Sequence, residues 1–134
     1  MNALAGLGTG GPTGKGLLID TEVLIDYIAG REQASDFLEY ARDDLHLSAV
    51  TLAEIGPLVR NDAEWQNLDA ALAAFIVHPV DKLIARTAAS LRGRTLAHRL
   101  IAATATIHEL RVVSRDKKFY PDSPNVLVPY QKII

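Results

Sequence analysis

Short apolar runs alternate with segments of helical periodicity along most of this chain. The first run, Leu17–Ile19, is wholly apolar and ends at Asp20, which is typical of a buried parallel strand. Apolar residues then recur at helical spacing as far as Gly30, a residue suited to ending a helix. The same pattern predicts strands at 17–19, 45–50, 75–80, 111–114 and 125–128, and helices before Gly30, near 32–41, at 51–59, from Asn61 past Leu72, at 81–91 and at 100–110.

Alternation of strands with helices of about ten residues implies right-handed crossovers and a parallel sheet covered on both faces. We therefore predict an α/β fold, a three-layer α/β/α sandwich with a mostly parallel five-stranded sheet. Residues 1–16 hold most of the nine glycines and lack apolar periodicity. They are predicted to form a flexible extension before a single domain at 17–134.

Composition narrows the possible chemistry. The 134 residues contain no cysteine, which excludes a disulfide framework, thiolate catalysis and a cysteine zinc site. No apolar stretch approaches the ~18 residues of a membrane span, and the start of the chain lacks the pattern of a secretion signal. We therefore expect a cytoplasmic protein with no membrane partner.

The charges are unevenly distributed along the chain. Net charge is −2, but residues 1–67 carry 11 acids and 4 bases, whereas residues 68–134 carry 5 acids and 10 bases. This asymmetry fits either solvated helix faces of opposite sign or a basic surface for a polyanion, and the distribution alone does not choose between them.

Three acids follow predicted strands. Asp20 comes directly after the first strand, Glu54 lies one turn into the helix after the second, and Asp116 lies just beyond the fourth. Carboxyl ends of parallel strands share one edge of the sheet, so these side chains can converge. Clustered carboxylates attract a divalent cation such as Mg²⁺, which prefers oxygen ligands and supports phosphodiester chemistry.

Each acid also has a purely structural interpretation. Asp20 can cap the helix that it precedes, Glu54 can complete a capping box with Thr51, and Asp116 can cap a turn at 116–119. Three independent caps need not fall on one edge of one sheet, however, and this favours a shared site.

Four segments, taken together, resemble the PIN-domain family and in particular its VapC-type toxin ribonucleases. They are 17–27 (LLIDTEVLIDY), 48–55 (SAVTLAEI), 100–105 (LIAATA) and 112–119 (VVSRDKKF), and the resemblance extends from Leu17 to Val128. It implies a parallel five-stranded sheet between helices, an endoribonuclease dependent on Mg²⁺ or Mn²⁺, a homodimer, and inhibition by a cognate antitoxin.

Within this resemblance, Asp20 corresponds to the first metal-binding aspartate, Glu54 to the second acid and Asp116 to the fourth. The third acid is absent, because family members usually read Pro-Asp-Ala-Leu where this chain has Ala-His-Arg-Leu at 97–100. His98 therefore stands at the aspartate position. It can be a metal ligand better suited to Mn²⁺ than Mg²⁺, a proton-transfer group, or a polar residue in the turn after a Thr95 cap.

Basic residues near the predicted site are candidate contacts for RNA phosphates, although they also fit a solvated rim. They are Arg94, Arg99, Arg115 and Lys117.

Two functions follow. The first is a metal-dependent ribonuclease with an altered metal site, which the retention of three mutually repelling acids favours. The alternative is a catalytically inactive PIN-like module that binds RNA or a protein partner, which His98 favours.

Overall fold

The computed structural model describes residues 16–131. The predicted N-terminal extension therefore lies outside the described residues, except for Gly16. This glycine is buried, and its carbonyl oxygen accepts a hydrogen bond from the Arg111 backbone N–H at 3.0 Å.

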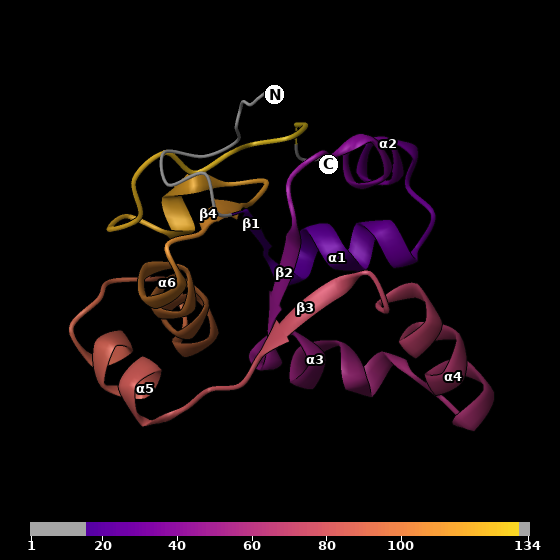
Figure 1. The fold of residues 1–134 in the computed structure, drawn as a ribbon, viewed down its shortest axis with the longest axis horizontal. Coiled ribbons are helices and arrows are strands. Elements are labelled where there is room, and N and C mark those ends of the chain that lie inside the picture. The colour runs from indigo at the N-terminus through magenta and orange to yellow at the C-terminus, as the bar shows by residue number, and fades with distance from the viewer. Residues whose placement is uncertain (1–15, 132–134) are drawn as a thin grey trace.

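Strands and helices alternate as the sequence predicts (Figure 1). The elements are β1 (Leu17–Ile19), α1 (Thr21–Ile28), α2 (Glu32–Tyr40), β2 (Leu45–Ser48), α3 (Ala49–Ile55), the 3₁₀ helix η1 (Gly56–Leu58), α4 (Asp62–Ala71), β3 (Phe75–His78), α5 (Lys82–Ala89), α6 (Leu96–His108), β4 (Arg111–Val113) and the 3₁₀ helix η2 (Lys117–Phe119). Within residues 16–131, no helix has the length and apolar character needed to cross a membrane.

The sheet is parallel, with strand order β3-β2-β1-β4. It has four strands rather than the predicted five, because the segment at 125–128 contributes only one bridge, between Leu127 and Val113. Asn125 has a positive φ of 57°, and Pro124 and Pro129 flank the segment without backbone donors. A longer ladder cannot form there.

Helices cover the two faces of the sheet, which confirms the three-layer architecture. Figure 1 shows α5 and α6 on one side, and α1 to α4 on the other. Alternate residues of β1 supply the two cores: Leu18 packs with Ile101 of α6, whereas Leu17 and Ile19 pack with Leu24 of α1. Because a one-residue slip would exchange these faces, the register of β1 is strongly specified.

Two helix starts differ from the predicted boundaries, and both help to position the candidate site. The Ser48 hydroxyl accepts a hydrogen bond from the Val50 backbone N–H, so α3 begins at Ala49 instead of Thr51. The Thr95 hydroxyl likewise accepts from the His98 backbone N–H, so α6 begins at Leu96, earlier than expected. Consequently His98 lies in the first turn of α6.

Candidate active site

Asp20 is the centre of the candidate site. Its backbone N–H continues the sheet by donating to the Val113 carbonyl at 3.0 Å, and its Oδ1 caps α1 by accepting from the Val23 N–H at 3.0 Å. The capping role predicted from sequence is therefore real. The second oxygen, Oδ2, remains and faces the Tyr120 hydroxyl at 3.5 Å.

Asp20 is only 1% exposed, and this burial dominates its electrostatics. Burial raises the pKa of Asp20 from 3.8 to about 6, although hydrogen bonds from Val23 and Ser114 oppose this shift. Glu22 raises the pKa further, and Arg115 lowers it. Within the described part of the chain, no cation forms a direct ion pair with this carboxylate, so it is poorly compensated.

Glu54 is held beside Asp20 by two buried hydroxyls. Its Oε1 accepts a short hydrogen bond from Thr21 Oγ1 at 2.6 Å, and Thr21 Oγ1 lies 3.0 Å from Thr51 Oγ1. Because the single Thr21 proton goes to Glu54, the Thr51 hydroxyl must donate to Thr21. Ser48 rather than Glu54 caps α3. The Glu54 carboxylate therefore points away from the start of α3 and toward Thr21, the residue that follows Asp20.

Asp116 lies at the adjoining strand end, since β4 pairs directly with β1. Its Oδ1 caps η2 by accepting from the Lys118 N–H at 2.9 Å, and its own N–H donates to Ser114 Oγ at 3.1 Å. Ser114 also lowers the pKa of Asp20, while its hydroxyl donates to the Asp116 carbonyl oxygen at 3.2 Å. Asp116 is thus connected to the centre of the site through Ser114, while its carboxylate is engaged as a cap.

His98 joins the same group from the start of α6. Its Nδ1 lies 3.0 Å from Thr95 Oγ1, and its ring stacks on Phe119 with centroids 4.7 Å apart. Burial lowers the pKa of His98, whereas the nearby carboxylates of Glu22 and Glu54 raise it. The lowered pKa favours a neutral imidazole at neutral pH, so a ring nitrogen keeps a lone pair for a proton or a metal.

Glu22 and Tyr120 also belong to the site, although the motif pattern did not assign them. Glu22 interacts electrostatically with Asp20, His98 and Tyr120. Its place on the first turn of α1 was a usable signal. Tyr120 is 1% exposed, and burial with the adjacent carboxylates raises its pKa well above 10. An aromatic residue that packs in the core gives no sequence signal of a hydroxyl facing Asp20.

The donor set fits a divalent cation in its chemistry. Asp20, Glu22 and Glu54 offer carboxylate oxygens and His98 an imidazole nitrogen, a mixture suited to Mn²⁺ more than to Mg²⁺. The poorly compensated, buried Asp20 carboxylate supplies a reason for a cation to bind. Within residues 16–131, however, no three His, Asp or Glu side chains are already arranged around a metal position. The side chains would have to turn to complete one.

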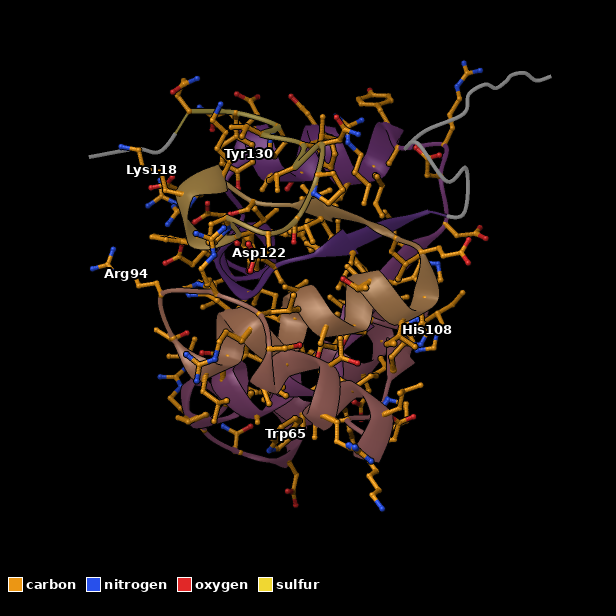
Figure 2. All side chains as sticks on the ribbon, turned by 90° about the vertical axis from the view of Figure 1, so that its left-hand side faces the viewer. Trp65, Arg94, His108, Lys118, Asp122 and Tyr130 are labelled. Atoms are coloured by element: carbon orange, nitrogen blue, oxygen red, sulfur yellow. The ribbon has the colours of Figure 1, made fainter. Side chains whose placement is uncertain are left out.

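The basic residues expected to contact RNA divide into two groups. Arg94 and Lys117 are exposed, Arg99 is half-buried, and the Arg94 guanidinium lies over the Phe119 ring at 5.3 Å. Figure 2 shows Arg94 and Lys118 projecting from the same side of the molecule, opposite His108. Arg115 differs, because its side chain is 13% exposed and forms ion pairs with Asp26 and Glu22.

Comparison with known proteins identifies the fold. The family model of the PIN domain matches residues 17–121. The chain belongs to the PIN-domain family. It is 32% identical over 124 residues to ribonuclease VapC10 of Mycobacterium tuberculosis, a match that covers 85% of this chain and 92% of that one. The resemblance inferred from the sequence motifs is therefore confirmed.

Solved structures with a similar fold include toxin–antitoxin proteins. A toxin–antitoxin complex from Klebsiella pneumoniae superposes with a TM-score of 0.77 and 29% identity, covering 87% of this chain and 99% of that one. FitAcB from Neisseria gonorrhoeae superposes with a TM-score of 0.71 and 26% identity, covering 84% and 97%.

The raised pKa of Asp20 predicts a signed dependence of stability on pH in the metal-free protein. Between the unfolded value near 3.8 and the folded value of about 6, the folded protein keeps a proton that the unfolded chain releases. Stability therefore falls as pH rises through this window, by about 3 kcal/mol at most. Asp20→Asn keeps a capping oxygen and removes the charge, so it should raise the unfolding free energy at pH 7.5 but not at pH 4.

Urea unfolding in EDTA at both pH values measures this effect. Asp20→Ala is the matched variant, because it removes the charge and the cap together and should be about 1 kcal/mol less stable than Asp20→Asn at either pH. A clear loss of stability in Asp20→Asn at pH 7.5 would mean that the ionised carboxylate stabilises the fold.

Proposed function

We propose that residues 17–134 form a divalent-metal-dependent endoribonuclease that is the toxin of a toxin–antitoxin pair in the cytoplasm. The observation that carries this proposal is the pairing of a buried, poorly compensated Asp20 with a Glu54 carboxylate fixed by the Thr21 and Thr51 hydroxyls. Similarity to VapC10, which is named a ribonuclease, supports the activity and the substrate class.

Each residue has a distinct task in the proposed reaction. A divalent cation, Mn²⁺ or Mg²⁺, would supply positive charge there to activate water and to stabilise the phosphate oxygens. Asp20, Glu54 and His98 would hold it, with Asp116 at the adjoining strand end. Thr21 keeps Glu54 oriented, which preserves one carboxylate oxygen for the cation or for a proton from the attacking water. Arg94, Arg99 and Lys117 would contact the RNA backbone.

Two observations favour the alternative, a PIN-domain module that binds RNA or protein without cleaving. His98 contributes no negative charge where the family has an aspartate, and the Asp116 carboxylate is engaged in capping η2. Both reduce the attraction of the site for a cation.

Cleavage of RNA by the purified protein tests the main proposal. We expect structured RNA to be cut with Mn²⁺, more slowly with Mg²⁺, and not in EDTA, while Asp20→Asn and Glu54→Gln reduce the rate at least a hundredfold. Asp69→Asn, which removes an exposed acid of α4, is the control and should cut normally. RNA binding without cleavage in every metal would support the binding module instead.

His98→Asp should increase the affinity for Mg²⁺. The substitution returns one negative charge to the site and suits the first turn of a helix, where acids are favourable. We expect about tenfold tighter Mg²⁺ binding and a corresponding gain in cleavage, an effect reduced from the bare Coulomb energy by desolvation. Calorimetric titration of both proteins measures the change. Unaltered Mg²⁺ binding by a well-folded variant would mean that position 98 does not face the cation.

A surface suited to binding the proposed antitoxin lies on the helix layer formed by α1 to α4. Between α1, α2, α3, η1 and α4 lies an apolar groove of about 740 Å³, lined by Ile25, Ile28, Ile55, Leu58 and Leu68 and bordered by Arg60 and Glu64. Ile28 and Leu58 are 48% and 62% exposed, which is unusual for large apolar side chains that line one groove. We propose that an amphipathic segment of the antitoxin docks there, and that the toxin is itself a homodimer.

Leu58→Asp should weaken binding of the cognate antitoxin at least tenfold, because it places a charge against an apolar segment. Isothermal titration calorimetry with the co-purified antitoxin measures the affinity. Leu83→Asp is the matched control, since Leu83 is 57% exposed on α5 and does not line the groove. Equal loss of binding in both variants would argue against this groove.

A further inference from the structure

The guanidinium of Arg115 points into the protein, although the position of Arg115 beside Asp116 predicted a contact with RNA phosphates. Its side chain is 13% exposed; Nη1 lies 3.1 Å from Asp26 Oδ2, and Nη2 lies 3.4 Å from Glu22 Oε1. Its Nε is buried without a hydrogen-bond partner among the described residues. An orphaned donor costs stability, so the position of this guanidinium must be stabilised by another interaction.

Asp26 alone does not account for that position. The Asp26 carboxylate already receives Arg31 Nε at 3.2 Å and the Tyr130 hydroxyl at 2.7 Å. With Arg31 and Arg115 both beside it, one carboxylate faces two cations, and one positive charge is in excess. Figure 2 shows Tyr130 and Lys118 in the upper part of the molecule. Arg115 connects this network to the candidate site through its ion pair with Glu22.

The positive charge of Arg115 that Asp26 does not neutralise lies close to the acidic residues of the site. Arg115 pairs with Glu22, and its field lowers the pKa of Asp20, which forms no direct ion pair within residues 16–131. Asp20, Glu22 and Glu54 together carry three negative charges when ionised, and the neutral form of His98 compensates none of them.

We infer that Arg115 is a positioning residue that holds Glu22 and balances the charge of the Asp20, Glu22 and Glu54 group while no divalent cation is bound. The inference rests on the proposed metal-dependent function and adds a regulator of metal affinity to it. Arg115 and a divalent cation are attracted by the same carboxylates and repel each other. The guanidinium therefore stabilises the metal-free protein and weakens metal binding.

The test compares three variants with the wild-type chain. Arg115→Gln removes the charge, Arg115→Lys keeps it, and Arg86→Gln removes an exposed arginine of α5 as the matched control. Metal-free proteins are titrated with Mn²⁺ by calorimetry, and their unfolding in urea is measured in EDTA and in saturating Mn²⁺.

Arg115→Gln should bind Mn²⁺ roughly tenfold more tightly, because loss of a unit charge near the cation removes repulsion. It should also unfold at lower urea concentration in EDTA, with a smaller difference in Mn²⁺. Arg115→Lys should bind Mn²⁺ within about twofold of wild type, and Arg86→Gln should match wild type in both measurements. A merely structural residue would give the opposite metal result, since loosened ligands bind less tightly.

Equal or weaker Mn²⁺ binding by folded Arg115→Gln overturns the inference. If that variant does not fold, the double variant with Glu22→Gln replaces it, since removal of both partners relieves the imbalance. It should be more stable in EDTA than Arg115→Gln, and failure to recover stability also overturns the inference. Tighter Mn²⁺ binding without any RNA cleavage would support the role of Arg115 and refute the ribonuclease proposal. Failure of the Arg115 inference can therefore be told apart from failure of the ribonuclease proposal.

Discussion

The parallel pairing of β1 with β4 is the constraint on which the rest of the structure depends. Leu17, Leu18 and Ile19 pair in register with Arg111, Val112 and Val113, and the Asp20 N–H extends the ladder by one hydrogen bond. This register fixes the ends of both strands at one edge of the sheet. Ser114 then lies where it lowers the pKa of Asp20 while accepting from the Asp116 N–H, and Arg115 turns back toward α1. A shift of one residue would separate these groups and also expose the apolar face of β1.

Much of this arrangement could be predicted from the sequence, because it depends on local signals. Periodicity predicted the order of strands and helices, and the strand ends predicted that Asp20 and Asp116 follow strands at one edge of the sheet. The fifth strand was wrong because apolar residues at 126–128 match a strand, whereas the backbone of Asn125 and the flanking prolines prevent a ladder. The start of α3 was misplaced because Ser48 fits both the end of a strand and a helix cap, and only the hydrogen bond to Val50 decides.

The chemistry of the site was harder to predict, because it depends on contacts between distant residues. Arg115 lies next to Asp116 in the sequence, but its partners Glu22 and Asp26 are about ninety positions away. The sequence pattern marked Thr51 only as part of a capping box and did not mark Thr21, yet their hydroxyls decide how Glu54 is oriented. His98 could be located but its surroundings could not, since stacking on Phe119 requires η2 to fold back over the start of α6.

The strand order has a consequence for the chain during its synthesis. In the order β3-β2-β1-β4, the last strand of the sheet to emerge from the ribosome pairs with the first, across more than ninety residues. Such distant contacts form late and slowly, because a long loop must close before they stabilise the fold. A nascent chain that ends before β4 lacks the partner of β1, together with Ser114 and Arg115. The complete acidic edge therefore appears only after β4 and the residues that directly follow it have been translated, which delays the assembled site long after β1 has emerged.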